Sequence, residues 1–149
     1  MAKPSIPDLF AQLADAAREL DQESTRINEL IRSYEARLRL VCIDVDVWLE
    51  DLTTEDIGRE KWQIELGFAR LDEGWHLAIR RSDEHPTRTE RPTKLLDAPR
   101  QMRQLALITL PDLIGRVLFI AMEERWSCEH TRKNLAERDQ PHDPPALVQ

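Results

Sequence analysis

Residues 62–82 read WQIELGFARLDEGWHLAIRRS, and this stretch decides the fold. Apolar and polar side chains alternate on both sides of an Asp72-Glu73-Gly74 turn, which is the pattern of two strands that each bury one face. The inward set is Trp62, Ile64, Leu66 and Phe68 before the turn and Trp75, Leu77 and Ile79 after it. If Glu73 and Gly74 form a two-residue loop, Phe68 faces Ile79 and the apolar sides agree. The sequence therefore predicts an antiparallel hairpin.

The residues before the hairpin predict one more strand. Positions 41–50 alternate again, and the apolar face carries Val41, Ile43, Val45, Val47 and Leu49. The acidic stretch 50–60 then predicts a connecting loop. After the hairpin, the polar residues 83–96 include two prolines and predict a long loop.

A long helix is expected before the strands. Ser5, Pro7 and Asp8 are typical of a helix start, because Ser5 can cap, proline tolerates the first turn and the acid can complete a capping box. Apolar spacings of three and four then continue for about 30 residues without a glycine or proline. The stripe comprises Phe10, Leu13, Ala17, Leu20, Ser24, Ile27, Ile31, Tyr34 and Leu38.

A second helix is expected after the strands, with Asp97 as its cap and Pro99 in its first turn. Pro111 lies inside this helix and should kink or divide it. The apolar window 105–122 contains Pro111, Asp112 and Arg116, which favours a buried helix over a membrane span.

Together these elements predict an α+β fold made of a long N-terminal helix, a three-stranded antiparallel meander and a C-terminal helix kinked at Pro111. Both helices are expected on one face of the sheet. The chain of 149 residues fits a single domain over 1–135, followed by a proline-rich tail over 136–149.

The net charge of −7 disfavours nucleic acid and anionic membranes as partners. The two cysteines, Cys42 and Cys128, form no CxxC pair, and the N-terminus has no secretory signal pattern, so a reducing cytoplasmic setting is expected. No cofactor motif and no nucleophile–base pattern stands out, so no catalytic residue and no cofactor is assigned.

Three carboxylates offer an alternative, enzymatic reading. Asp44 and Asp46 point to one face of the expected strand, where Glu65 of the neighbouring strand could join them. Carboxylate oxygens are ligands for a hard cation such as Mg²⁺, so a metal-dependent enzyme is the alternative hypothesis. The simpler reading is an exposed acidic sheet face. Cys128, His130, His142 and Asp143 lack a recognised zinc-ligand spacing.

A basic segment offers a further alternative. Residues 80–103 hold seven basic and four acidic side chains, whereas residues 44–73 hold three basic and ten acidic ones. The segment could contact phosphate or nucleic acid, and the plain alternative is a solvated surface.

Two long apolar helix surfaces compete for one sheet face, so apolar surface should be left over. We therefore expect a non-enzymatic interaction or accessory protein that forms a homodimer and also binds another protein. The candidate interface on the first helix comprises Leu13, Ala17, Leu20, Ile27, Ile31 and Tyr34.

Two stretches resemble a group of small bacterial proteins of unknown function. One is Leu66-Gly67-Phe68-Ala69-Arg70-Leu71 leading into Trp75-His76-Leu77-Ala78-Ile79-Arg80. The other is Asp97-Ala98-Pro99-Arg100-Gln101-Met102-Arg103 leading into Leu110-Pro111-Asp112-Leu113-Ile114. The resemblance covers about two thirds of the chain. It implies a bacterial, phage or mobile-element origin, and it supplies no activity and no functional residue.

Overall fold

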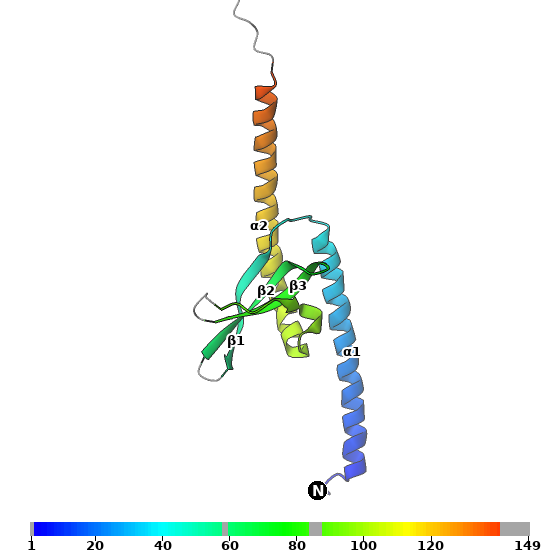
Figure 1. The fold of residues 1–149 in the computed structure, drawn as a ribbon. Coiled ribbons are helices and arrows are strands. Elements are labelled where there is room, and N and C mark those ends of the chain that lie inside the picture. The colour runs from blue at the N-terminus through cyan, green and yellow to red at the C-terminus, as the bar shows by residue number, and fades with distance from the viewer. Residues whose placement is uncertain (1, 58–59, 84–87, 141–149) are drawn as a thin grey trace, which may run out of the picture.

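A computed structural model describes residues 2–57, 60–83 and 88–140. The elements are helix α1 (Ile6–Arg39), strands β1 (Val47–Ile57), β2 (Glu60–Leu71), β3 (Gly74–Asp83) and β4 (Thr93–Lys94), the 3₁₀ turn η1 (Leu95–Asp97) and helix α2 (Arg100–Arg138). The strands form one antiparallel sheet in the order β1-β2-β3-β4, of which Figure 1 labels the first three. The α+β fold predicted from the sequence is confirmed, and the short strand β4 extends the predicted meander within the expected 83–96 loop.

The β2–β3 hairpin forms as predicted, but its register is shifted. Leu71 pairs with Gly74, so the loop is Asp72-Glu73, and Phe68 faces Leu77 instead of Ile79. Gly74 has a φ of 137°, a conformation that favours glycine. It lies at the first position of β3 and not within the two-residue loop. Because the shift is two residues, every side chain stays on its predicted face.

The predicted first strand is wrong in position. The strand begins only at Val47 and continues to Ile57, through residues that the sequence predicts as a loop. Residues 41–46 instead turn the chain out of α1, and Cys42 has a φ of 56°. Ile43 reaches the core from this connection, while Val41 and Val45 are exposed. An alternating pattern cannot show whether an apolar side chain is buried by a sheet or by a connection beside it.

The sheet face opposite the helices carries its own packed layer. The Trp48 ring lies on Gly67 of the neighbouring strand, and the Arg80 guanidinium lies over that ring, 4.1 Å from its centre. Arg80 also pairs with Glu65, which accepts a hydrogen bond from Ser82. A Cβ at position 67 would overlap both the Trp48 ring and the Val47 carbonyl oxygen. The glycine is therefore required by close packing.

Replacing Gly67 with alanine is expected to lower the free energy of unfolding by about 1–3 kcal/mol, because the added methyl group must displace the Trp48 ring or backbone. Urea unfolding followed by tryptophan fluorescence measures the change. Gly115→Ala is the matched control: a Cβ there meets nothing within 4 Å, and alanine favours the helix. Equal stability of the two variants would contradict the close packing at Gly67.

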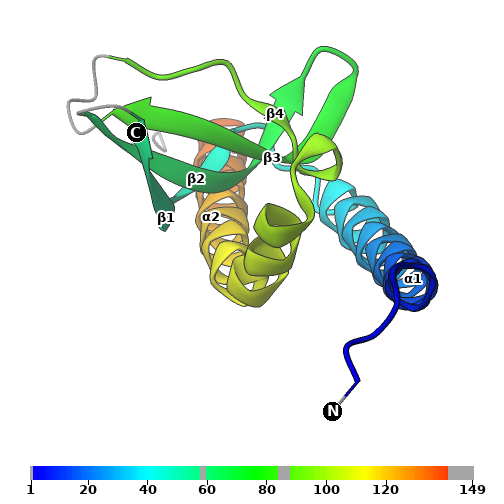
Figure 2. The same ribbon diagram turned by 90° about the horizontal axis from the view of Figure 1, so that it is seen from below.

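Both helices lie on the same side of the sheet, as predicted (Figure 2). The core forms between them and the inward face of β1, β2 and β3. Its fully buried large side chains are Phe68, Ile31, Ile64, Leu66, Leu77, Leu95, Leu113, Val47 and Val117. We call this compact part, together with the sheet, the body.

Helix α2 differs from its prediction at its two ends. Asp97 belongs to η1, and Pro99 occupies the N-cap position without a side-chain hydrogen bond. The helix is bent, as predicted: its first turns run at an angle to the rest, and Pro111 lies inside the helix without dividing it (Figure 2). The helix also continues past the predicted domain end at residue 135, as far as Arg138.

The window 105–122 is not a buried helix either. Its buried residues are Ala106, Leu110, Leu113 and Val117, which form a single narrow stripe. Helix α2 is long and apolar enough to cross a membrane. The core helices of soluble proteins meet the same criterion of length and composition. Five large apolar side chains of the window are exposed instead: Ile108, Ile114, Leu118, Phe119 and Met122.

Candidate interaction surface

The first half of α1 projects from the body. Residues 6–26, which we call the N-arm, precede the first buried residue of the helix, Ile27. A capping box between Ser5 and Asp8 closes its start, as predicted. A row of exposed apolar side chains along one side of it, which we call the N-stripe, comprises Ile6, Leu9, Phe10, Leu13, Ala17 and Leu20. The N-stripe continues the row that is buried in the body further along the same helix.

The predicted interface on α1 is therefore divided by the structure. Leu13, Ala17 and Leu20 are exposed on the N-arm. Ile27 and Ile31 are buried in the core of their own chain, and Tyr34 packs against that core. Placing Ile27 and Ile31 at an intermolecular interface is wrong, because the sheet and α2 already cover them.

The last half of α2 projects in the same way. Residues 118–138, the C-arm, follow the last buried residue of the helix, Val117. An exposed apolar row, the C-stripe, runs from one turn inside the body along the C-arm and comprises Ile114, Leu118, Phe119, Met122 and Trp126. Phe119, Met122 and Trp126 line a shallow hollow on this row. The Trp126 ring stacks on His130, with ring centres 5.2 Å apart.

The two arms leave the body in opposite directions (Figure 1). A buried carboxylate fixes the direction of α1: Glu35 Oε1 accepts a hydrogen bond of 3.0 Å from the backbone N–H of Leu77, on the part of β3 that β4 does not pair. Arg39 donates to the carbonyl oxygen of Trp75 at 2.7 Å. Because these bonds tie the last turns of α1 to the sheet, the N-arm is held away from the body.

Replacing Glu35 with alanine is expected to lower the free energy of unfolding by about 1–3 kcal/mol, because it leaves the Leu77 N–H without an acceptor in a buried place. Glu35→Gln keeps an oxygen acceptor there and should lose much less. Thermal unfolding of the two variants beside the wild type measures the difference. Equal losses would show that the hydrogen bond to Leu77 does not hold α1.

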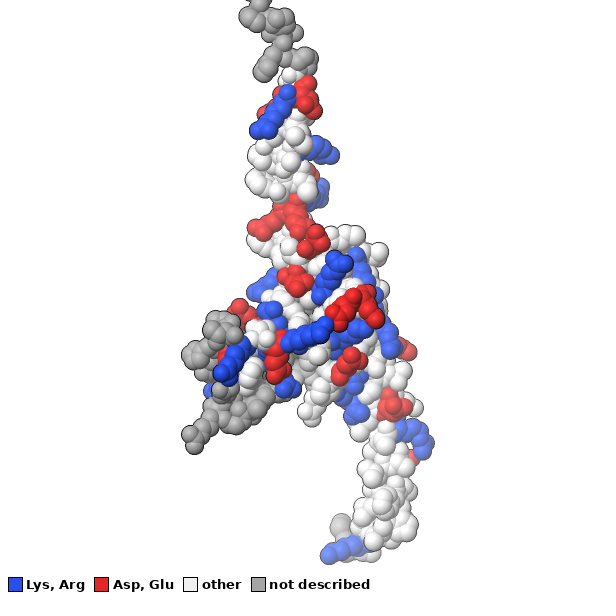
Figure 3. Space-filling view, viewed as in Figure 1, with Lys and Arg blue, Asp and Glu red and all other residues white. Residues whose placement is uncertain are grey.

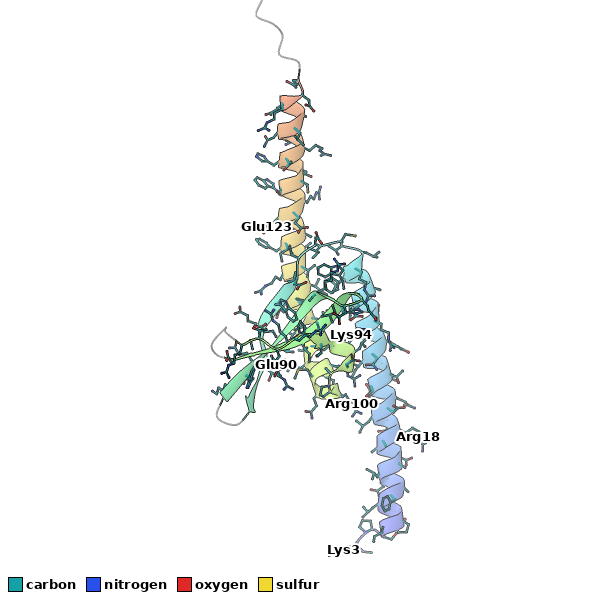
Figure 4. All side chains as sticks on the ribbon, viewed as in Figure 1. Lys3, Arg18, Glu90, Lys94, Arg100 and Glu123 are labelled. Atoms are coloured by element: carbon teal, nitrogen blue, oxygen red, sulfur yellow. The ribbon has the colours of Figure 1, made fainter. Side chains whose placement is uncertain are left out.

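A second clamp joins α1 to the start of α2. Arg100 donates to the Ser24 hydroxyl at 2.7 Å, and Arg103 donates to the Asn28 side-chain oxygen. Figure 4 shows Arg100 beside α1, with Arg18 on the N-arm and Glu123 on the C-arm. The clamp lies at the inner end of the N-arm, so it marks where the body stops supporting α1.

Charge is sparse on the visible side of the N-arm, which is mostly white in Figure 3, while charged side chains crowd over the body. By sequence, the N-arm holds five acidic and two basic side chains, a net charge of −3. The C-arm holds four of each and is neutral overall. Two ion pairs within the N-arm, Arg18–Asp15 and Arg26–Glu23, are largely exposed to solvent.

Comparison with protein-family models, with curated proteins and with solved structures finds no match. The resemblance to small bacterial proteins therefore stays an expectation from the quoted residues. The surfaces of the chain itself must carry any inference about function.

The three carboxylates of the enzymatic alternative are not brought together. Asp46 accepts a hydrogen bond from the Arg70 backbone N–H at 3.0 Å, and Glu65 is paired with Arg80. Asp44 lies in the connection before β1. Within the described ranges 2–57, 60–83 and 88–140, no group of three or more His, Cys, Asp or Glu side chains could hold a metal ion. Cys128 and His130 lie on the C-arm, whereas His142 and Asp143 fall outside the described residues.

The basic segment 80–103 is largely engaged within the chain. Besides the contacts of Arg80, Arg100 and Arg103 described above, Arg91 pairs with Asp72 at 2.7 Å. The other two arginines of the segment, Arg81 and Arg88, also have interactions. Arg91, Arg100 and Arg103 thereby join the segment to the turn between β2 and β3 and to α1.

Sequence reasoning missed the C-stripe as a site. The signal in the sequence is the apolar window 105–122, which contains Ile114, Leu118, Phe119 and Met122 but was predicted to be buried. The buried and exposed apolar rows of α2 are interleaved along one helix, so only the packing of the body separates them.

Proposed function

We propose that this protein is a non-enzymatic interaction protein that works as a homodimer in the cytoplasm, and that the dimer in turn binds a further protein. The observation that carries the proposal is the pair of exposed apolar stripes on the two arms. Phe10 is 65% exposed, Phe119 61% and Trp126 67%. Contiguous apolar surface of this kind marks sites of association.

The helical form of the arms supports the same conclusion. Most helix stability in proteins comes from packing an amphipathic face rather than from the helix propensity of its residues. Each arm is 21 residues long and has an apolar face that the described residues of its own chain leave exposed. Contact with another chain would stabilise both arms and remove their aromatic side chains from water.

Absolute mass from light scattering tests the proposal. The monomer mass is 17.4 kDa, and the wild type is expected at twice this value. Leu13→Glu with Leu20→Glu places two charges on the N-stripe and should give a folded monomer with an unchanged β-sheet signal in circular dichroism. Loss of both stripe side chains should weaken association by about 100-fold or more, since each is worth about 1.5–3 kcal/mol when buried.

The matched control is Gln12→Glu with Gln22→Glu, which adds the same two charges to the same arm away from the N-stripe. The control should remain dimeric. A wild type that stays monomeric at high concentration would overturn the homodimer proposal. Equal effects of the two double variants would show that charge, and not the apolar stripe, controls association.

A further inference from the structure

We propose that the dimer forms by exchange of arms: the N-arm of one copy packs antiparallel against the C-arm of the second copy, so that each N-stripe covers a C-stripe. This inference rests on the proposed function and names the partner of the stripes as a second copy of this chain. It also fixes which surfaces meet.

The direction of the arms fits a two-fold arrangement. The two arms project in opposite directions from one body (Figure 1). A two-fold axis perpendicular to the arms therefore places the N-arm of one copy and the C-arm of the other on the same side of the dimer. The N-arm runs toward its body and the C-arm away from its body, so the two helices are antiparallel. A two-fold axis makes this contact twice, which is the closed, self-complementary interface of most homodimers.

The two stripes also match in length. The N-stripe spans residues 6–20 and the C-stripe residues 114–126. At 1.5 Å per residue each is about 20 Å long. Antiparallel overlap of their centres places Leu13 within one helical turn of Met122 from the second copy.

Charge favours this exchange over self-pairing of N-arms. Two N-arms side by side would bring together net charges of −3 and −3, whereas an N-arm beside a C-arm brings −3 against a neutral helix. Exchange covers all four stripes of the dimer.

The area is sufficient for a specific interface. Phe10, Phe119 and Trp126 of both copies supply six aromatic side chains that are each about two-thirds exposed. Since such side chains bury about 150–250 Å² each, they alone would contribute roughly 600–1,000 Å². A specific interface needs about 1,000 Å² or more in total, and the aliphatic side chains of the stripes add to the aromatic part.

Cross-linking between engineered cysteines tests the exchange on the full chain. In a Cys42→Ser, Cys128→Ser background, Leu13→Cys and Met122→Cys are combined in one chain and treated with a bis-maleimide that spans about two helical turns, about 11 Å. The double-cysteine protein is expected to form a covalent dimer in high yield. Each protein with only one of the two substitutions is expected to stay uncoupled. The cysteines of its two copies then lie on equivalent arms, which project in opposite directions in the dimer.

The matched control replaces Leu13→Cys with Asp15→Cys, which lies on the opposite side of the N-arm, and should reduce the yield of covalent dimer at least fivefold. Coupling of Leu13→Cys alone would show N-arms paired with each other and would overturn the exchange while leaving the homodimer intact. A dimeric mass without coupling in the double-cysteine protein would likewise overturn the exchange alone. A monomer that sediments with phosphatidylethanolamine–phosphatidylglycerol vesicles would overturn both proposals and assign the stripes to a lipid surface.

Discussion

Ile31→Glu is expected to unfold the protein, whereas Leu13→Glu, about five turns away on the same stripe of α1, is expected to leave it folded. Ile31 is fully buried against the sheet and α2, while Leu13 is 62% exposed on the N-arm. A buried carboxylate without a partner costs several kcal/mol, which is comparable to the whole stability of a small domain. The same substitution therefore separates a core position from a surface position.

Circular dichroism and urea unfolding measure this contrast at low protein concentration, where association contributes little. Ile31→Glu should lack a cooperative transition, and Leu13→Glu should unfold at a urea midpoint close to that of the wild-type monomer. A folded Ile31→Glu variant would contradict the assignment of Ile31 to the core.

Phe68→Ala is expected to lower the free energy of unfolding by about 3–5 kcal/mol. Phe68 is among the largest side chains that are fully buried, and its ring stacks on Trp75 with centres 5.6 Å apart. Truncation to alanine leaves a cavity between the hairpin and the helices and removes the ring contact. Few single changes in this body should cost more.

Urea unfolding followed by far-ultraviolet circular dichroism measures the loss without relying on the Trp75 signal. Phe68→Leu is the companion variant, since it keeps most of the apolar volume and should lose substantially less stability. If Phe68→Ala cost under about 1 kcal/mol, the core would not be centred on the hairpin as described.

The hairpin could be predicted because two local signals agree there. The alternation through Phe68 and the turn before Trp75 both specify antiparallel strands with one buried face. The register could not be fixed from these signals, since shifts of two residues preserve every face. The observed register places Glu65 opposite Arg80, and this pairing removes Glu65 from the predicted carboxylate cluster.

The candidate site could be predicted only in part. The row on α1 keeps the same spacing from the N-arm into the body, and the single polar residue in it, Ser24, does not by itself mark Ile27 as the first buried position. That boundary is set by long-range contacts such as those of Glu35 with β3 and Arg100 with Ser24. The exposed row on α2 could not be predicted for the same reason. Which apolar row of this helix is buried depends on its contacts with the sheet.

Hydrogen exchange of the wild-type protein, followed by mass spectrometry across a dilution series, tests most directly whether the arms form the dimer interface. At concentrations where light scattering gives the dimer mass, peptides from residues 6–26 and 118–138 should be protected. On dilution to the monomer they should lose that protection, while peptides from β2 and β3 keep theirs. Unprotected arms in a dimeric sample, or loss of protection confined to the sheet, would contradict the account and place the interface on the body.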